Sequence, residues 1–399
     1  MNFSPTHKLD VYYSRKKEKL LVGTLLLQSR KILFEYSPDF LETGLELSPF
    51  KLPLKRGVHA CNEPLFDGLF GLFNDSLPDG WGRLLIDRKL ASMGINPMQL
   101  SPLDRLSFVG EGGMGALTYE PEKNTPLKSL HQKLDDLAKE AEHYQKNEDE
   151  KYLDDLLSAN GSSAGARPKA LLSIDKKDWV IKFRSTIDPI DIGPIEWAYH
   201  QMAQKAGLSL PEAKLFPSKL CGGFFGTVRF DKKKGGRIHM HTLSGLLHAD
   251  HRFPSLDYSA VMNATSLLTK DKRESEKQFR AIAFNILSHN RDDHAKNFSF
   301  LMNDEGQWQV SPAYDLTFSS GPAGEHCTMI MGEGRSPNKT HLIKLANSHG
   351  IQAQKGKEII EEVQEAIASW KTIAKNSHVS PSSSAMVQKA LEAIHNESP

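Results

Sequence analysis

The sequence predicts an α+β protein in which a small β-rich N-terminal subdomain precedes a larger domain of two lobes, the second of them mainly helical. Three observations lead to this prediction. Residues 1–120 contain short apolar runs separated by Gly and Pro turns, residues 121–150 are highly charged, and residues 151–399 begin with strand-like runs and continue with long helical patterns. With 399 residues, the chain is long enough for two or more domains with cores of their own.

The N-terminal subdomain and the segment after it differ in composition. Residues 82–93 form an amphipathic stretch that predicts a helix within the β-rich subdomain. Residues 121–150 carry Leu130, Leu134 and Leu137 at helical spacing among charged residues. We therefore expect a solvated connecting segment that is helical in part.

A run of small residues opens the larger domain, whose first lobe we expect to cover about residues 151–231. Small side chains in residues 160–166 would let backbone N–H groups approach phosphates closely, and Arg167 or Lys169 could supply positive charge. Such a run is also typical of a flexible linker. Residues 170–183 then predict a β-hairpin, which places the small residues in a loop that leads into a strand.

Two charged residues follow at positions that could face each other. Lys182 stands among apolar neighbours on the second strand of the hairpin, and Glu196 lies near the start of a helix predicted over residues 191–207. Glu196 could pair with Lys182, or it could be an acid favoured in the first helical turn by the helix dipole. Residues 227–231 predict a strand that runs out into a polar turn, a suitable hinge between the lobes.

The second lobe, about residues 232–399, contains the most informative stretch of the chain, residues 289–297. Apolar residues at helical spacing over 279–287 predict a buried helix just before it. Residues 298–310 predict a β-hairpin just after it, and Asp315 emerges from that hairpin.

Asp292, Asn297 and Asp315 are the side chains that a phosphoryl-transfer site needs. Asp292 and Asn297 stand five residues apart, the spacing of the catalytic Asp and the metal-binding Asn in protein-kinase catalytic loops. Asn297 and Asp315 offer hard oxygen ligands for Mg²⁺, and Asp292 offers a proton acceptor. Asp and Asn in a loop are often only turn formers, but helix, loop, hairpin and Asp follow here in the order of a kinase C-lobe.

These residues carry a resemblance to the HipA-type toxin serine/threonine kinases. In the larger domain the matching stretches are SSAGARPK (162–169), RFD (229–231), DDHAKN (292–297) and PAYDL (312–316). In the N-terminal subdomain they are VGTL (22–25), FEY (34–36), NDSLPDGWG (74–82) and FVGEGGMGAL (108–117). The resemblance implies a bilobal protein-kinase-like domain over residues 151–399 and a HipA N-terminal subdomain over residues 1–120.

The resemblance also implies roles for individual residues. Asp292 would be the catalytic aspartate, Asn297 and Asp315 would hold Mg²⁺, and Ser162 would be an autophosphorylated serine, although its neighbour Ser163 leaves the register open. The residues that would bind ATP are Ser162, Ser163, Ala164, Gly165, Ala166, Arg167, Lys169, Lys182, Phe230, His294 and Lys296.

Two positions depart from the family pattern or complicate it. Val228 stands before Arg229, where relatives often carry a glutamate, so hinge contacts there would come from the backbone. Asp293 doubles the carboxylate of the catalytic loop, and the alignment of the loop favours Asp292 as the base.

The resemblance implies an ATP- and Mg²⁺-dependent serine/threonine protein kinase that is the toxin of a toxin–antitoxin pair. Its protein substrate would be a translation enzyme, with aminoacyl-tRNA synthetases the leading class. A DNA-binding antitoxin of HipB type would neutralise it, and DNA would be bound only through that antitoxin. A kinase of a small molecule or lipid, and a non-catalytic nucleotide-binding partner of a repressor, are the alternatives.

Composition agrees with a globular cytoplasmic enzyme. The chain is 39% hydrophobic and 25% charged, with a formal net charge of +1, so it has no overall attraction to nucleic acid or membrane. Three cysteines without a C-x-x-C motif argue against a disulfide framework or a zinc ribbon. The first residues lack the apolar core of a signal peptide. Residues 359–373 predict one amphipathic helix, and a Ser-rich break from Ser380 precedes a last short helix.

Overall fold

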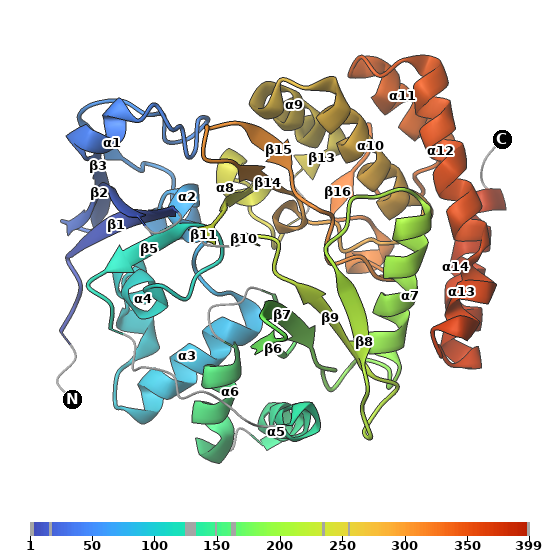
Figure 1. Ribbon diagram of the computed structural model, residues 1–399, viewed down its shortest axis with the longest axis horizontal. Coiled ribbons are helices and arrows are strands. Elements are labelled where there is room, and N and C mark those ends of the chain that lie inside the picture. Colours follow the sequence, from blue (N-terminus) through green and yellow to red (C-terminus); the bar gives the residue numbers. More distant parts are fainter. Residues whose placement is uncertain are drawn as a thin grey trace.

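The computed structural model describes residues 4–15, 18–123, 133–147, 150–160, 165–233, 236–253 and 256–396. Figure 1 shows the N-terminal sheet on one side of the molecule, a second sheet near the centre and a large group of helices on the opposite side. The α+β class predicted from the sequence is confirmed, and the C-terminal part is mainly helical, as expected.

The N-terminal sheet has five antiparallel strands in the order β4-β3-β2-β1-β5. They are β1 (Lys8–Arg15), β2 (Glu18–Gln28), β3 (Lys31–Tyr36), β4 (Val58–Ala60) and β5 (Leu117–Glu120). Leu9, Val11 and Tyr13 alternate along β1 and are completely buried, which is the period of two expected when one face of a sheet covers a core. Short helical segments complete this core: α1 (Pro38–Glu42), η1 (Leu65–Gly68), α2 (Gly71–Asn74), η2 (Pro97–Gln99) and α4 (Pro102–Val109).

Helix α4 begins where a reciprocal cap fixes its first turn. The backbone N–H of Asp104 donates to Ser101 Oγ at 3.1 Å, and the backbone N–H of Ser101 donates to the Asp104 carboxylate at 3.0 Å. The Asp104 carboxylate also accepts from the backbone N–H of Thr6 at 2.6 Å, so it ties the segment before β1 to the same helix. The helix predicted over residues 82–93 is α3 (Gly80–Ser92).

The charged segment after β5 contributes more to the core than a solvated connection would. Its helix α5 (Leu134–Asn147) buries Leu137, Ala141 and Tyr144, while Leu130 lies outside the described residues. Leu137 packs with the core of the central sheet, whereas Ala141 and Tyr144 pack with α3 and with α6 (Leu153–Asn160), which follows η3 (Glu150–Tyr152). The apolar stripe therefore joins the central sheet to α3 of the N-terminal part.

The central sheet has four antiparallel strands in the order β6-β7-β9-β8. They are β6 (Lys169–Ile174), β7 (Lys177–Lys182), β8 (Ala213–Phe216) and β9 (Phe224–Val228), and α7 (Ile192–Lys205) lies between β7 and β8 in the chain. The predicted hairpin is β6-β7, and its register pairs Lys169 with Lys182. Helix α7 buries its apolar face in the helical core, so it holds the central sheet against the C-terminal part.

The C-terminal part contains the largest core. Its helices are α8 (Leu243–Leu247), α9 (Tyr258–Thr269), α10 (Lys272–Leu287), α11 (Lys339–Ser348), α12 (Ala353–Ala368), α13 (Trp370–Asn376) and α14 (Pro381–Asn396), with 3-10 turns η4 (Ala295–Asn297) and η5 (Pro322–Gly324). Its short strands are β10 (Lys232–Lys233), β11 (Gly236–Arg237), β12 (His239–Thr242), β13 (Leu256–Asp257), β14 (Ser299–Met302), β15 (Trp308–Val310) and β16 (Thr328–Met329).

The last helices differ in one respect from the prediction. The single helix expected over residues 359–373 is broken at Ser369 into α12 and α13. The break lets Trp370 lie completely buried and donate its indole N–H to the backbone oxygen of Ser384 at 3.0 Å. Among the described residues, no helix combines the length and the apolar composition that crossing a bilayer requires.

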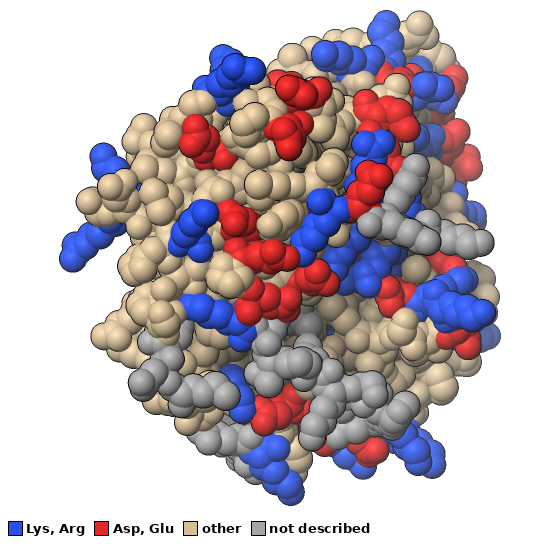
Figure 2. All heavy atoms as spheres, turned by 60° about the vertical axis from the view of Figure 1, so that its left-hand side comes forward, with Lys and Arg blue, Asp and Glu red and all other residues tan. Residues whose placement is uncertain are grey.

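The N-terminal part and the C-terminal part meet closely around α8. The Asp75 carboxylate accepts the backbone N–H and the hydroxyl of Thr242, both at 2.7 Å, and lies 2.6 Å from His241 Nδ1. A Cβ at Gly71 would come within 2.1 Å of the Gly245 backbone oxygen, so only glycine allows this approach of α2 to α8. On the face that brings the N-terminal part forward, acidic and basic side chains are interspersed (Figure 2).

Candidate active site

The loop over residues 289–297 is fixed at its start by α10 and by a neighbouring segment. Asn290 donates its side-chain amide to Asn285 Oδ1 of α10 at 2.9 Å. His289 Nδ1 lies 3.1 Å from the Ser319 backbone oxygen, and Asn290 forms a bridge with Ser319. The predicted order of helix, loop and hairpin is present as α10, this loop, and β14-β15. The loop is therefore held from both sides before it reaches Asp292.

The two adjacent aspartates of the loop have different surroundings. The side chain of Asp292 is 60% exposed. Asp293 is completely buried and accepts hydrogen bonds from the Tyr258 hydroxyl at 2.5 Å and from two backbone N–H groups, those of Cys327 and Thr328, while His326 Nδ1 lies at 2.8 Å. The acceptor sites of Asp293 are thus occupied within the protein. Asp292 is the aspartate of this pair whose carboxylate an incoming group can reach.

Asn297 closes the loop back onto Asp292. Its side-chain amide donates to the Asp292 backbone oxygen at 2.6 Å. The next residue of the predicted set, Asp315, has a left-handed backbone with φ of 53°, which turns the chain sharply after Tyr314. The Tyr314 hydroxyl contacts the Lys296 backbone oxygen and Ser299. It therefore joins the segment of Asp315 to the loop over residues 289–297, here called the catalytic loop.

Lys182 lies between two carboxylates. Its ammonium is 2.8 Å from Glu196 and 2.5 Å from Asp315. Burial alone would lower the pKa of Lys182, but the negative charges of Asp315 and Glu196 outweigh burial and raise it. Burial alone would raise the pKa of Asp315, but Lys182 and Lys169 hold it well below its usual value. The sequence left the role of Glu196 open, and the structure places it in contact with Lys182.

Glu196 continues the line of charges to the end of the small-residue run. Arg167 donates to Glu196 at 3.0 Å and makes two further bonds of 3.0 Å with the carboxylate of Asp188. Opposite charges therefore alternate from Asp188 through Arg167, Glu196 and Lys182 to Asp315. Such a network fixes each side chain more strongly than an isolated surface pair would.

Lys169 lies on the same side of the central sheet, opposite Lys182 in the β6-β7 register. Its side chain is buried, and this burial lowers the pKa of Lys169, although Asp315 acts in the opposite direction. Two lysines and Arg167 thus surround the carboxylates of this region. This concentration of cations is the environment that phosphate groups require.

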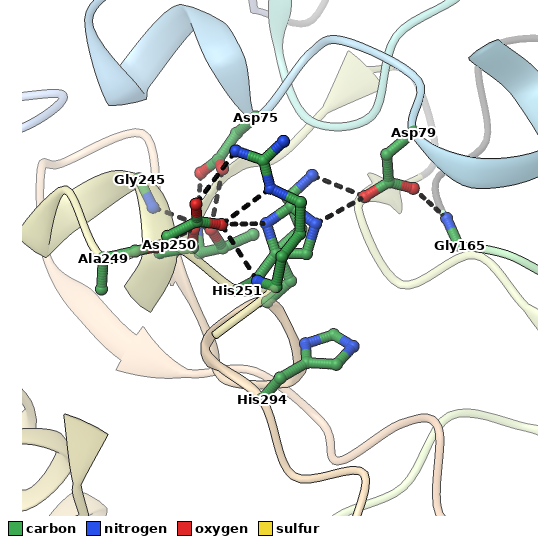
Figure 3. Close-up of polar contacts among 12 residues, drawn as sticks. Asp75, Asp79, Gly165, Gly245, Ala249, Asp250, His251 and His294 are labelled. Carbon is green, nitrogen blue, oxygen red and sulfur yellow. Dashed lines mark hydrogen bonds and ion pairs between the residues drawn. The ribbon is translucent and has the colours of Figure 1, made fainter. Parts of the chain in front are cut away.

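Asp79 of the N-terminal part joins the small-residue run to the catalytic loop. Its carboxylate accepts the backbone N–H of Gly165 and lies 2.6 Å from Lys296 Nζ. Figure 3 shows Asp79 between Gly165 on one side and the cluster around His251 on the other. Ser162, Ser163 and Ala164 lie outside the described residues.

The predicted hinge contacts the N-terminal part as well. Arg229 and Asp231 form a buried pair at 2.6 Å. The backbone N–H of Gly115 donates to the Asp231 carboxylate at 2.8 Å, and Arg229 donates to the Gly113 backbone oxygen at 3.2 Å. Phe230, between the two charged residues, has its ring centroid 5.6 Å from that of Tyr314, next to Asp315.

A pocket of about 510 Å³ opens beside Lys296 and Asp79. Most of its lining comes from the N-terminal part and from the segment after α8, including Phe66, Arg83, Ile86, His248, His251 and Arg252. Asp292, Asn297 and Asp315 do not line it. The pocket is therefore next to the catalytic loop and separate from the line of charges around Lys182.

The donor set of Asn297 and Asp315 fits a Mg²⁺ ion. Asp315 is held in its charged form, and the amide of Asn297 uses its nitrogen toward Asp292, which leaves its oxygen for a ligand. Among the described residues, no group of three or more His, Cys, Asp or Glu side chains could hold a metal ion by itself. Two protein ligands suit Mg²⁺, because this ion keeps waters and phosphate oxygens in its remaining positions.

Sequence reasoning missed three residues of this region. It assigned no role to Asp79, which stands within the NDSLPDGWG motif, and none to Asp188 or Asp231 as individual side chains. The available signal was the position of Asp79 three residues before the helix predicted over residues 82–93, and an aspartate near a helix start predicts an ordinary helix cap.

Two family models match separate parts of this chain. A family model described as HipA N-terminal domain matches residues 9–120, and one described as HipA-like C-terminal domain matches residues 161–370. The Sinorhizobium fredii protein called "Putative kinase Y4dM" is 23% identical over 217 residues, which are 50% of this chain and 53% of that protein. The chain thus matches about half the length of this curated relative.

A solved structure extends the likeness to nearly the whole fold. It is that of HipA from Shewanella oneidensis MR-1, in a complex with HipB and operator DNA. Its TM-score is 0.70, with 16% sequence identity over 96% of each chain. At this identity the likeness concerns the fold.

Proposed function

This chain belongs to the HipA family, as its motifs predicted, and from that membership we propose that it is an ATP- and Mg²⁺-dependent serine/threonine protein kinase. The observation that carries the proposal is the arrangement around Lys182. A buried lysine lies between Glu196 and Asp315, beside a loop in which Asp292 is exposed and the Asn297 amide donates to the Asp292 backbone oxygen. These are residue types that phosphoryl transfer uses, which supports the proposal.

In the proposed mechanism, the chain's own residues position two reactants. Lys182 and the backbone N–H groups of the small-residue run hold the phosphates of ATP. Asp292 accepts a hydrogen bond from the hydroxyl of the acceptor, orients it toward the γ-phosphorus and takes its proton as the new P–O bond forms. Glu196 keeps Lys182 in place while the phosphates arrive. Transfer is direct, without a covalent enzyme intermediate.

Asn297 and Asp315 would hold Mg²⁺, which neutralises charge on the phosphate oxygens when it is bound. The other predicted ATP contacts also keep their roles in this proposal. Phe230 lies at the hinge, and His294 and Lys296 lie in the catalytic loop. His294 Nε2 is 3.9 Å from the carboxylate of Asp292, the proposed base.

We further propose that this kinase is the toxin of a cytoplasmic toxin–antitoxin pair. A translation enzyme, with an aminoacyl-tRNA synthetase as the leading class, is the proposed protein substrate because of the family resemblance. The proposed antitoxin is a DNA-binding protein of HipB type, and DNA would be bound through it. Two features support an indirect role in DNA binding: the net charge of +1, and the mixture of charges on the face in Figure 2.

Autophosphorylation of Ser162 is part of the proposal. Ser162 stands three residues before Gly165, so the chain between them can separate their Cα atoms by at most about 11 Å. A phosphoserine carries about −1.5 to −2 charges at neutral pH. It would compete with ATP for Arg167, Lys169 and the N–H groups of the run. The modified enzyme would therefore bind ATP weakly and be inactive.

A phosphoproteome tests the proposed function and separates it from its alternatives. Cells that express the wild-type protein are compared with cells that express Asp292→Asn. A cellular protein that gains phosphoserine or phosphothreonine only with the wild type supports the proposal. A labelled metabolite or lipid would instead indicate a small-molecule kinase. A purified protein that binds ATP but transfers no phosphate to any acceptor would indicate the non-catalytic partner of a repressor.

A further inference from the structure

We propose that Asp79 is a positioning residue for phosphoryl transfer. Its side chain holds the end of the small-residue run and Lys296 of the catalytic loop in one fixed arrangement. This inference rests on the proposed function. Through Asp79, the N-terminal part of the chain would directly position segments of the active site. The run that precedes Arg167, here called the phosphate loop, comprises residues 160–166, of which 160, 165 and 166 are described.

The first observation is that the two oxygens of the Asp79 carboxylate face different segments. Oδ1 accepts the backbone N–H of Gly165 at the end of the phosphate loop. Oδ2 lies 2.6 Å from Lys296 Nζ, in the residue just before Asn297. Asp79 and Lys296 are 217 positions apart in the sequence. One side chain thus spans the gap between the two loops whose relative position decides whether ATP meets Asp292.

The second observation is that the Asp79 side chain does not cap helix α3, although capping is the usual role of an aspartate at the N-cap position. Asp79 is the N-cap residue of α3, where an aspartate normally accepts a hydrogen bond from the first turn of its own helix. Its side chain makes no such bond. A cap of this kind is worth on the order of 1 kcal/mol. The carboxylate turns instead toward Gly165 and Lys296, away from the helix that it precedes.

The backbone around Asp79 is fitted to the same loop. The N–H of Trp81 donates to the Gly165 backbone oxygen at 3.0 Å, so Gly165 is held through both its N–H and its C=O. Gly80 has φ of +45°, and a Cβ there would lie 2.6 Å from Ala166 Cα. The start of α3 therefore packs directly against the phosphate-loop backbone, with no space for a larger residue.

The electrostatic surroundings keep Asp79 charged. Burial alone would raise the pKa of Asp79, but Lys296 and the Gly165 N–H outweigh burial and lower it. Another neighbour, His251, has its Nε2 3.8 Å from the carboxylate. Burial and Lys296 lower the pKa of His251 to about 4, so it is neutral near pH 7.

Two substitutions separate the effect of the Lys296 contact from the effect of the Gly165 contact. Asp79→Asn keeps an oxygen for the Gly165 N–H but replaces the charge facing Lys296 with an amide. Asp79→Ala removes both contacts. Asp75→Asn is the matched control, because Asp75 lies on the same segment and also binds the C-terminal part, through Thr242, without touching either loop.

The full-length protein is tested for Mg-ATP affinity, for the kcat and KM of ATP hydrolysis without an acceptor, and for thermal stability. For Asp79→Asn we expect kcat to fall by roughly 10- to 100-fold with a small change in KM, because a reacting group displaced by about 1 Å costs up to this much. Asp79→Ala should also raise the KM for ATP several-fold and speed hydrogen exchange at Gly165 and Ala166. Asp75→Asn should lower the melting temperature and leave kcat and KM near their wild-type values.

Different outcomes overturn different conclusions. Wild-type kcat and KM in both Asp79 variants would remove the role of Asp79 and leave the kinase proposal intact. Equal losses in Asp75→Asn would show that any damage to the contact between the two parts lowers activity, and would also overturn the specific role of Asp79. A wild-type protein that neither binds nor hydrolyses Mg-ATP would overturn the proposed function itself, and this inference with it.

Discussion

The carboxylates of Asp292 and Asp293 are neighbours in the chain but point to opposite environments. Asp292 is open to solvent beside Asn297, whereas Asp293 lies inside the protein, where Tyr258 and two backbone N–H groups donate to it. One residue can therefore meet a substrate while the other holds the loop to the segment around Cys327. We therefore expect the substitution of Asp by Asn to have different effects at the two positions.

Asp292→Asn should abolish phosphoryl transfer and leave Mg-ATP affinity nearly unchanged. The amide keeps the shape of the side chain but cannot take the proton of the acceptor hydroxyl, a contribution of roughly 10²–10⁴ in rate. Transfer measured with radiolabelled ATP, alongside calorimetric ATP binding, checks this. Wild-type transfer in Asp292→Asn would exclude it as the base.

Asp293→Asn should primarily destabilise the protein. The amide nitrogen would face the Cys327 and Thr328 N–H groups or the Tyr258 hydroxyl, so at least one buried donor would lose its acceptor. A loss of about 1–3 kcal/mol per orphaned group is expected in the free energy of unfolding. Urea denaturation gives this value. A variant as stable as the wild type but inactive would instead indicate that Asp293 acts in the reaction.

Glu196→Gln should weaken ATP binding. The change removes the charge that holds Lys182 from one side and Arg167 from the other, so both cations gain freedom. We expect the affinity for Mg-ATP to fall about tenfold, the range of a single buried charge-assisted hydrogen bond. Glu212→Gln is the matched control, since its pair with Lys177 lies on the surface. Equal effects of the two substitutions would contradict a specific role for Glu196.

Autophosphorylation should occur on Ser162 and depend on Asp292. Intact-mass spectrometry after incubation with Mg-ATP should show one added phosphate on the wild type and none on Asp292→Asn or Ser162→Ala. Peptide mapping distinguishes Ser162 from Ser163. The phosphorylated protein should bind ATP weakly. Retention of full ATP affinity after phosphorylation would show that this modification does not limit activity.

Acid should destabilise the protein in part through His239. Burial, helped by His241, lowers the pKa of His239 to about 3 from its ordinary value of 6.5. Below about pH 6.5 the unfolded chain binds a proton here that the folded protein does not, so the free energy of unfolding decreases as the pH falls from about 6.5 toward 3. At pH 5 the loss amounts to about 2 kcal/mol.

His239→Gln should therefore flatten the decrease in urea midpoint between pH 7 and pH 5. His7→Gln, at an exposed histidine, controls for the substitution itself. An unchanged slope in His239→Gln would show that other groups account for the acid sensitivity.

Local patterns in the sequence were sufficient for the elements that carry the site. The apolar spacing before residue 288 predicted α10, because one face of that helix is buried. The pattern of strand, turn and returning strand over residues 298–310 predicted β14 and β15. An ion pair between Lys182 and Glu196 was one of two interpretations that the sequence allowed, because a helix that follows a β-hairpin can bring two such residues close together. The sequence could not choose between that pair and a first-turn acid.

Contacts between distant segments were outside the reach of those patterns. The pairing of Asp79 with Lys296 joins two loops whose local sequences contain no sign of each other. In α5, the apolar spacing predicted the helix, but the frequent charged residues led to the expectation of a solvated segment, whereas Leu137 and Tyr144 are buried. The break at Ser369 follows from the buried position of Trp370, which depends on a partner fourteen residues later, in α14. Each of these features is decided by tertiary packing.

The contact of Gly71 with Gly245 limits how the parts of this chain can be exchanged between relatives. Because neither backbone leaves space for a side chain, a foreign N-terminal part would fit only if its surface matched α8 in shape as well as in hydrogen bonding. The hydrogen bonds of Asp75 with Thr242 and of Asp231 with Gly115 also cross the junction, so a foreign part would have to match the hydrogen-bonding groups at these two points. A chimera would therefore have to inherit both faces of the junction from one parent.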